Sequence, residues 1–457
     1  MAAETQQAQP KVFGYLPEDT PKAGAMLSLG FQQFLTMFPA TVLVALLTKF
    51  DVGVTLVASG LGTIVALLVA KRKIPMYYGS SFSYIAVIIT VMSKFAPACF
   101  NSPNQVYCPE GVRIAQVGIL LTAVFEILVG FLIMRIGKAS LDKVLPPIVT
   151  GSMAMVIGIA LAGAALGNAS SNWAVAFITL IATIVFSVYL QGKGLIGMLP
   201  ILLGAIFGYF VSIPFGLVQF GHVVSAPWFD VPPFTFPAFT NPAAWGMALS
   251  VALIFIATVP ESTAHLYQMS LYIDRLATDL KRQPTSIKNL IGLNLVADGS
   301  DDVVNGLLGG CAGTNYGENN SLMAITRNYS TSVLMTAGVM AIAMGFFGKL
   351  VAAVNTMPGA VIGGLSIYLF GVIGMQGVAL IQSEKVNLFD PKNLAVGATI
   401  LVLGIGGNLA LPNGLFPFAI PYLFPSGIPA IVFAAIVGIF INLIFVLFRT
   451  PEVRNEE

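Results

Sequence analysis

Charged residues are scarce in this chain of 457 residues: only 9% are Asp, Glu, Lys or Arg, against roughly 25% in an ordinary soluble domain. Histidine and cysteine are also rare, with two and three copies. We find no metal-ligand cluster, no nucleotide-binding glycine loop and no pairing of nucleophile and base that would support an enzyme. No metal, cofactor or nucleic-acid partner is therefore expected. Since 56% of the residues are hydrophobic, the chain is predicted to be an integral membrane protein.

The hydrophobic residues fall into runs close to the roughly 20 residues needed to cross a bilayer as a helix. An all-α polytopic membrane protein with fourteen transmembrane segments is predicted. The segments cover residues 25–47, 52–70, 77–92, 115–136, 145–166, 173–190, 195–213, 243–268, 287–308, 311–330, 331–356, 358–382, 393–408 and 427–447.

The distribution of positive charge predicts the orientation, because cytoplasmic loops collect Lys and Arg. With both termini in the cytoplasm, all of the 22 Lys and Arg residues except Lys49, Lys94, Arg113 and Lys349 lie on the cytoplasmic side. No cleavable signal peptide is expected. The predicted parts are a cytoplasmic tail (1–24), a first group of seven segments (25–213), an external connection (214–242), a second group (243–447) and a second cytoplasmic tail (448–457).

The cysteines leave one question open. Cys99 and Cys108 fall in the same predicted outer loop, where they could form a disulfide or remain two unpaired thiols. Cys311 lies at membrane depth and is interpreted as a small packing residue.

An internal repeat links the third and tenth segments. Residues 78–86 align without gaps to residues 316–324 at an offset of 238, with Tyr, Gly, Ser and Ala recurring at matching places. Because seven is odd, the second group enters the membrane from the opposite side, so the two groups form an inverted repeat. Each copy is predicted to hold a short extended stretch followed by a half-helix, whose free N–H groups face a shared binding place.

The polar stretch from Leu308 to Ser330 contains the second copy and an ionisable residue, Glu318. A carboxylate at membrane depth is costly, and its default interpretation is functional. The eighth segment contains a second carboxylate, Glu261, four residues before His265 and directly after Pro260, which weakens the local helix. Spacing of four residues puts both side chains on one helical face. They form a candidate proton relay, although His265 could instead bond only to backbone near the interface.

Other acids at membrane depth have two interpretations each. Asp298 could lie beside Glu261 and Glu318 and hold them in place without contacting the substrate, or it could simply accept hydrogen bonds from backbone N–H groups near Gly299. Asp301 and Asp302 are candidates for lining the same aqueous region. Glu126 could face the core of the bundle without a direct role.

Together these residues resemble the nucleobase-ascorbate transporter family, also called nucleobase cation symporter type 2, and within it the uracil permease branch. The most specific part is the string from Glu318 to Arg327, Glu-Asn-Asn-Ser-Leu-Met-Ala-Ile-Thr-Arg, which is similar to the family signature. Glu at its first position is typical of uracil carriers, Gln of xanthine and urate carriers, and Pro of ascorbate carriers.

The resemblance implies a set of site residues. Glu261 and Glu318 would bind the base, with the backbone amides of Phe82 and Gly317 completing the pocket and Tyr316 beside it. His265 would take part in proton coupling together with both glutamates.

The remaining implications concern supporting residues and architecture. Asp298, Asn319 and Ser81 would support the site. The family likeness also implies a core of segments 1–4 and 8–11, a gate of segments 5–7 and 12–14, an elevator-type movement between them, and a homodimer in the cell membrane surrounded by lipid.

Three positions depart from the family pattern. Ser321 stands where the signature has Gly, Gln32-Gln33 where many members have Gln-His, and Phe370 where uracil permeases can have a pocket tyrosine. Tyr368 lies two residues away and faces differently on a helix. These departures leave the choice of base open.

Two anionic glutamates in one pocket repel each other, so at least one is expected to bind a proton with the substrate. The predicted function is proton-coupled uptake of a nucleobase, with uracil as the first choice. A proton- or sodium-coupled carrier of xanthine or urate is the alternative. An anion transporter of the same fold is disfavoured by the charge of Glu318.

Overall fold

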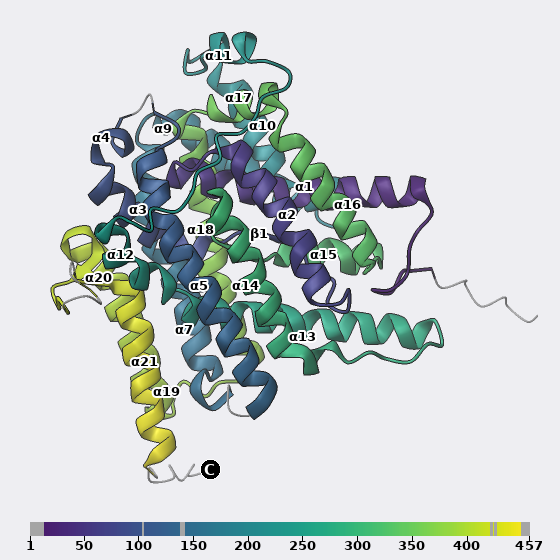
Figure 1. The fold of residues 1–457 in the computed structure, drawn as a ribbon, viewed down its shortest axis with the longest axis vertical. Coiled ribbons are helices and arrows are strands. Elements are labelled where there is room, and N and C mark those ends of the chain that lie inside the picture. The colour runs from purple at the N-terminus through teal and green to yellow at the C-terminus, as the bar shows by residue number, and fades with distance from the viewer. Residues whose placement is uncertain (1–12, 103–104, 138–141, 421–423, 425–426, 449–457) are drawn as a thin grey trace, which may run out of the picture.

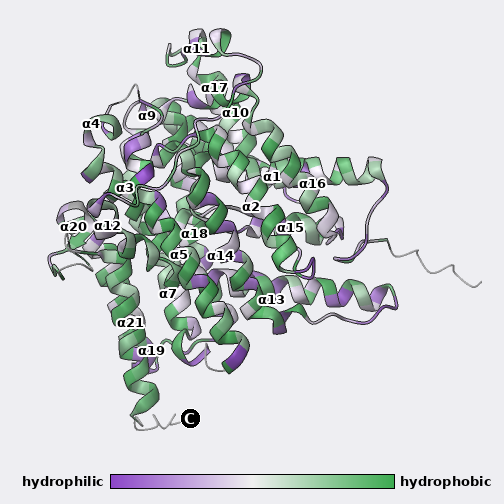
Figure 2. Cartoon of the chain, in the orientation of Figure 1, coloured by the Kyte–Doolittle hydropathy of each residue, from purple (hydrophilic) through white to green (hydrophobic). Residues whose placement is uncertain are grey.

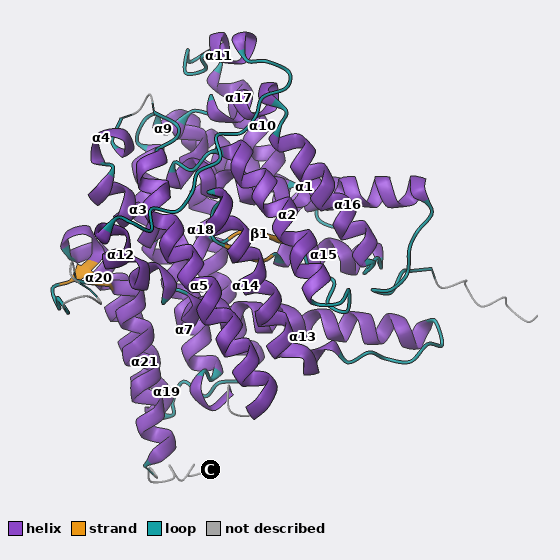
Figure 3. Cartoon of the chain, in the orientation of Figure 1, coloured by secondary structure: helices purple, strands orange, loops and turns teal. Residues whose placement is uncertain are grey.

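The computed structural model describes residues 13–102, 105–137, 142–420, 424 and 427–448 (Figure 1). Most of this chain is helical, as Figure 3 shows. The helices of the first half are α1 (Ala23–Thr48), α2 (Val52–Val69), α3 (Ile85–Phe95), α4 (Pro97–Phe100), α5 (Pro109–Ile136), α7 (Pro147–Ala160), α8 (Ala162–Ala169), α9 (Trp173–Tyr189), α10 (Pro200–Ser212) and α11 (Phe220–Ser225). Those of the second half are α12 (Pro242–Ala252), α13 (Phe255–Asp279), α14 (Ile291–Leu308), α15 (Gly317–Thr326), α16 (Thr331–Gly345), α17 (Gly348–Asn355), α18 (Gly359–Ser383), α19 (Pro391–Leu401), α20 (Gly407–Ala410) and α21 (Ala430–Leu447).

Four short strands and several tighter or wider turns complete the chain. The strands are β1 (Tyr78–Ser80), β2 (Gly313–Asn315), β3 (Leu415–Phe416) and β4 (Ile428–Pro429). A 3₁₀ turn, η1 (Phe82–Tyr84), leads into α3, and a π-helical turn, Val402–Gly406, joins α19 to α20. The predicted tails at 1–12 and 449–457 lie outside the described residues.

Among the described residues, eight helical stretches are long and apolar enough to cross a membrane, and four shorter apolar helices accompany them. Figure 2 shows hydrophobic residues along most helices, with hydrophilic ones gathered toward the far end of α13 and in the connections. The predicted segments 287–308 and 311–330 correspond to α14 and to β2 with α15, whose polar residues lower their hydropathy. The chain is therefore a multi-pass membrane protein.

The structure confirms the predicted extended stretches in the third and tenth segments. β1 and β2 pair as antiparallel strands, with Tyr78 opposite Asn315 and Ser80 opposite Gly313. Each strand is followed by a helix, η1 with α3 in one case and α15 in the other. The two helix starts are therefore held together by main-chain hydrogen bonds between segments that lie far apart in the sequence.

Helix boundaries differ from several of the predicted spans, as in the span 145–166, which is divided into α7 and α8 at Leu161. The predicted span 331–356 is divided into α16 and α17, with a break at Phe346–Phe347. In the eighth segment the helix continues through Pro260, and the interruption between α12 and α13 lies upstream, at Leu253–Ile254. Hydrophobic runs report burial but not the axis of a helix, so none of these breaks is visible in hydropathy.

The helices pack in two groups. In one, α5 packs against α14 and α12, while α2 packs against α16 and α14, and α1 joins through α16. In the other, α18 packs against α7, α8 and α9, while α19 packs against α21 and α7. β1 and β2 belong to the first group because they contact α2 and α14.

Glycines allow the closest approach in the first group. A Cβ atom at Gly60 of α2 would lie 2.3 Å from the carbonyl oxygen of Gly338 in α16, and one at Gly338 would lie 2.7 Å from the carbonyl oxygen of Gly60. Each helix thus presents its bare backbone to the other, as small residues do in membrane helix packing.

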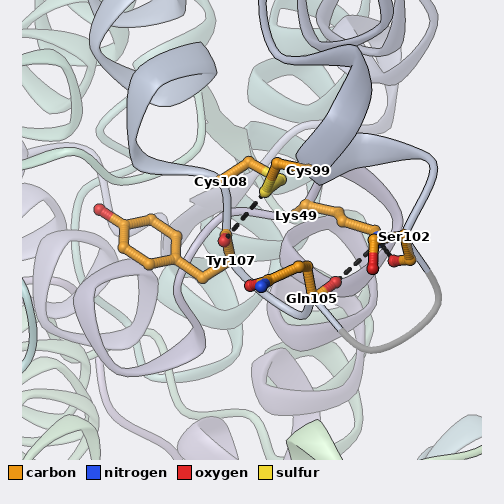
Figure 4. Close-up of a disulfide and its surroundings, with 6 residues drawn as sticks. All are labelled: Lys49, Cys99, Ser102, Gln105, Tyr107 and Cys108. Atoms are coloured by element: carbon orange, nitrogen blue, oxygen red, sulfur yellow. Dashed lines mark hydrogen bonds between the residues drawn. A yellow bond between two sulfur atoms is a disulfide. The ribbon is translucent and has the colours of Figure 1, made fainter.

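A disulfide between Cys99 and Cys108 links the end of α4 to the start of α5 (Figure 4). This resolves the alternative left open by the sequence. Lys49, which ends α1, donates hydrogen bonds from Nζ to the carbonyl oxygens of Ser102 and Gln105, at 2.6 and 2.7 Å. Partial burial lowers the pKa of this ammonium group. Cys311 is buried and unpaired, as predicted.

The contact between α2 and α16 predicts a strong size limit at Gly60. Gly60→Ala is expected to lower the free energy of unfolding by about 1–3 kcal/mol, because the added methyl group overlaps the Gly338 backbone. Thermal unfolding of the purified protein measures the effect. Gly24→Ala is the control, since nothing lies within 4 Å of a Cβ at that position, and equal melting temperatures for the two variants would contradict the proposed contact.

Candidate binding site at the crossing of the broken segments

The two strands bring the starts of two helices to one place. Gly317 is the first residue of α15 and Phe82 the first of η1. The first N–H groups of a helix have no partner within it. Among the described residues no acceptor is found for the amides of Phe82 and Gly317, so both donors remain available to a ligand.

Tyr316 fixes the start of α15 against the first repeat. Its buried hydroxyl donates to the carbonyl oxygen of Ser80 at 2.9 Å and accepts from the Thr41 hydroxyl at 2.9 Å. A Cβ atom at Gly79 would lie 2.6 Å from the Tyr316 ring. The ring therefore lies across Gly79, and the tyrosine serves the scaffold that holds the site.

The structure brings Glu318, Glu261 and His265 together. Glu318 lies in the first turn of α15 and is half-buried, where the helix dipole favours a negative charge. Glu261 and His265 lie one turn apart on α13. The Glu261 carboxylate interacts electrostatically with both His265 and Glu318 and lies close to the Ser83 hydroxyl. Glu261 is exposed, His265 is half-buried, and the carboxylates are thus accessible to a small molecule.

A chain of side-chain hydrogen bonds orients His265. The Asn315 amide nitrogen donates to Ser262 Oγ at 2.7 Å and to Asp298 Oδ1 at 3.4 Å. Its oxygen, Oδ1, lies 2.7 Å from His265 Nδ1 and can only accept. Neutral His265 therefore carries its proton on Nδ1, a tautomer assigned from the network. Nε2 is then the basic nitrogen, and it lies 2.8 Å from where a Cβ of Gly317 would be.

Asp298 lies at the far end of this chain of hydrogen bonds. The Ser262 hydroxyl donates to its Oδ2, and Asn294 donates to Ser262 Oγ at 2.6 Å. Asp298 is buried and does not contact Glu318 in any hydrogen bond among the described residues. It is connected to His265 through Ser262 and Asn315.

The other two supporting candidates differ from each other. Asn319 is buried and donates from Nδ2 to the backbone carbonyl and side-chain oxygen of Gln33, at 2.9 and 2.7 Å, which fastens α15 to α1. Ser81 donates its backbone N–H to Ala312 at 2.8 Å, and its hydroxyl finds no partner among the described residues. Ser81 thus helps to hold the two extended stretches together through its backbone N–H group and not through its side chain.

Phe82 connects the two packing groups. Its half-buried ring meets Phe370 of α18 edge-on, with ring centroids 6.1 Å apart. Tyr368, two residues earlier, points elsewhere and shares a hydrogen bond with Ser187 of α9 at 2.5 Å. Phe370 therefore gives the site an apolar surface. This is the position at which uracil permeases can have a pocket tyrosine.

The remaining acids of α14 do not line an aqueous region, which corrects the expectation for Asp301 and Asp302. Both are completely buried. Asp302 Oδ1 accepts the backbone N–H of Gly313 at 2.6 Å, and Asp301 Oδ2 accepts from Asn305 at 2.9 Å. A Cβ at Gly313 would lie 1.8 Å from Asp301. The two carboxyl groups hold β2 against α14.

Glu126 is likewise buried and accepts from the Thr258 hydroxyl at 3.0 Å. It joins α5 to α13 one turn before Glu261. Within the described residues, no three His, Cys, Asp or Glu side chains are grouped as they would be around a metal ion.

Several members of this site were not singled out by the sequence. Ser83, Asn315, Ser262 and Thr41 have ordinary hydroxyl or amide side chains, and their neighbours Glu261 and Tyr316 are the only local signal. Their partners come from other segments, so only the packed structure identifies them.

Comparison with known proteins adds a line of information independent of this geometry. Residues 24–412 match the Permease family that contains nucleobase-ascorbate transporters. The chain is 35% identical to the uracil permease of Bacillus caldolyticus, with 93% of each chain covered. It is 32% identical to the uracil permease of Bacillus subtilis (96% and 95% covered) and 31% identical to that of Escherichia coli K12 (93% of each).

Solved structures share the fold at low sequence identity. The transmembrane domain of the cyanobacterial bicarbonate transporter BicA superposes with a TM-score of 0.56 at 17% identity, covering 84% of this chain and 96% of that one. The murine Solute Carrier 26 family member A9 anion transporter, in its inward-facing state, gives a TM-score of 0.63 at 13% identity, covering 98% and 74%.

The hydrogen-bond chain predicts unequal effects for two polar residues of this region. Asn315→Ala should lower the free energy of unfolding by about 1–3 kcal/mol, because it leaves buried partners unsatisfied. Ser321→Ala is the control: the Ser321 side chain is exposed, and its hydroxyl bonds only to the Gly317 carbonyl of its own helix, at 3.0 Å, so a change within about 0.5 kcal/mol is expected. Melting temperatures that respond equally would contradict the role given to Asn315.

Proposed function

The chain belongs to the Permease family of nucleobase-ascorbate transporters, and from this premise we propose that it takes up uracil across the cell membrane together with protons. As a permease it is a transporter and not an enzyme. The observation that supports the proposal best is the meeting of two carboxylates, Glu261 and Glu318, with two unpaired helix-start amides. The uracil permease relatives make this base the first choice.

Uracil offers alternating N–H donors and C=O acceptors along one edge. In the proposed complex the carboxylates of Glu261 and Glu318 accept from the N–H groups of the base. The amides of Phe82 and Gly317 donate to its carbonyl oxygens, and the Phe82 and Phe370 rings cover its faces. Tyr316 holds the start of α15 in register.

Proton coupling follows from charge. Two carboxylates that point at one small ligand repel each other, so binding of the base is favoured when one proton is shared between them or held by His265. His265 Nε2 is the basic atom available, since Nδ1 is engaged by Asn315. Release of the proton on the inner side then weakens binding and frees the base. No other cofactor is required.

The proposed transport cycle moves one packing group against the other. Fourteen crossings, arranged as two inverted repeats of seven with both termini in the cytoplasm, are the proposed topology. The core (segments 1–4 and 8–11) contains β1 and β2. It also contains the two carboxylates, Glu261 and Glu318, and the two helix-start amides. The gate contains α18 with Phe370. The packing of α5, α14, α2 and α16 apart from α18, α7 and α9 supports this division. An elevator-type displacement and a homodimer are proposed with it by family likeness.

Neutral substitutions at the two carboxylates test the site. Glu318→Gln and Glu261→Gln are each expected to reduce uptake of labelled uracil by about tenfold or more, since each loses a charge-assisted bond to the base. Glu384→Gln is the control, because Glu384 is an exposed residue at the end of α18. Wild-type uptake by either site variant removes that residue from the site. Stronger competition by unlabelled xanthine than by unlabelled uracil would assign the same site to a purine.

Proteoliposomes test the coupling ion. With the base supplied outside and no sodium, an inward proton gradient should drive accumulation above equilibrium, and collapse of the gradient should abolish it. His265→Ala is expected to retain exchange of labelled for unlabelled base while losing gradient-driven accumulation. Equal accumulation with and without the gradient would refute proton coupling, and an unchanged pH dependence in His265→Ala would remove His265 from the relay.

A further inference from the structure

A cavity with basic residues in its lining lies where three stretches of the chain meet. It has a volume of about 470 Å³ and is lined by Glu18, by Lys71, Arg72 and Lys73 in the turn after α2, and by Thr285 and Leu290 in the connection from α13 to α14. A cavity of this size can hold a small polar group with part of a larger molecule. Its lining is unusual for this chain, because three consecutive basic residues, Lys71, Arg72 and Lys73, line one cavity.

The positive charge of this cavity is not balanced. Glu18 is its only acidic lining residue, and the Arg282 guanidinium already binds that carboxylate. Arg72 donates from Nε to Thr331 Oγ1 at 3.1 Å and from Nη2 to Ser332 Oγ at 2.5 Å, both of which are neutral. Among the described residues, Lys71 and Lys73 have no ion-pair partner. The cavity therefore presents an excess of cationic donors.

The backbone holds the three basic residues in a defined arrangement. Lys71 and Arg72 both have a left-handed conformation, with φ of 53° and 57°, which is uncommon for residues other than glycine and costs of order 1 kcal/mol each. The turn is held by the N–H of Arg72 donating to Leu67 at 2.8 Å and that of Lys71 donating to Leu68 at 2.9 Å. The lysines thus extend from an ordered turn at the end of a helix.

The N-terminal stretch forms another wall and is itself anchored. The Arg282 guanidinium also binds Asp19 at 2.8 Å. Thr331 donates from its backbone N–H and its hydroxyl to the carbonyl oxygen of Pro17, at 3.1 and 2.8 Å. Both sides of the cavity are therefore fastened to the same packing group, and the space between them persists without a ligand.

The surroundings indicate where the ligand comes from. Leu68 lies about one turn before the three basic residues and is 55% exposed on an apolar membrane helix. The cavity therefore adjoins the surface that faces lipid. Phosphate groups of phospholipids lie at the ends of membrane helices, and basic pockets there bind anionic head groups. We propose that this cavity binds a phosphate group, carried by an anionic phospholipid or by a soluble phosphate ester, through Lys71, Lys73 and Arg72.

Titration of the purified full chain in detergent tests the proposal. Phosphatidylglycerol, phosphatidylcholine and glycerol phosphate are added separately, and the melting temperature and bound mass by native mass spectrometry are recorded. Phosphatidylglycerol should stabilise the wild type more than phosphatidylcholine does. Lys71→Gln with Lys73→Gln should weaken its apparent affinity by about tenfold or more, whereas Lys71→Arg with Lys73→Arg should retain it.

Lys385→Gln with Lys392→Gln is the matched control. It removes the same charge, and Lys385 also follows a helix with a left-handed φ, of 52°. Loss of phosphatidylglycerol binding only in the Lys71 and Lys73 variant supports a lipid site, and the same pattern for glycerol phosphate supports a soluble ester. Equal losses in both glutamine variants would show that only overall charge matters and would overturn the proposal, as would no binding of either probe.

Discussion

The structure depends on satisfying the backbone of two extended stretches at membrane depth, where no water is available to bond with free N–H and C=O groups. β1 and β2 satisfy each other by pairing, and side chains complete the task. The hydroxyls of Ser59 and Thr63 donate to the carbonyl oxygen of Tyr78, and Asp302 accepts from Gly313. The helix starts after the strands are then left with free donors, and these donors can bind a ligand. Asp302 of α14 and the hydroxyls of α2 belong to this requirement and not to the ligand.

A second consequence is the position of the two glutamates. Glu318 is placed by the end of β2, and Glu261 by a continuous helix, α13, that approaches from the other side. Their mutual repulsion is tolerated because His265 lies next to Glu261. The chain from His265 through Asn315 and Ser262 to Asp298 fixes the histidine ring, so the basic nitrogen faces the start of α15. In the proposed function, binding and proton uptake would act on the same few atoms, which is what coupling between them requires.

The bicarbonate transporter and the Solute Carrier 26 anion transporter share this fold at 17% and 13% identity. In this chain the fold brings two helix starts together. The groups added around those starts decide the ligand. In this chain they are two carboxylates and an aromatic pair, Phe82 and Phe370, which in the proposed function bind a flat ligand with N–H donors.

The sequence by itself was sufficient for the membrane class and for the extended stretches of the third and tenth segments, and it singled out Glu261, Glu318 and His265 as candidates. Hydrophobic runs, isolated charges and helical spacing are local properties, and the cost of a charge at membrane depth makes each such residue informative. The tertiary structure decided which polar groups meet: Asn315 with His265, Ser83 with Glu261, Asp302 with the backbone of β2, and Glu18 with Arg282 beside the three bases. It also showed that Asp301 and Asp302 are buried between α14 and β2 and do not line an aqueous region. Contacts of this kind join residues separated by up to hundreds of positions, so they follow from how the helices pack and not from any local pattern.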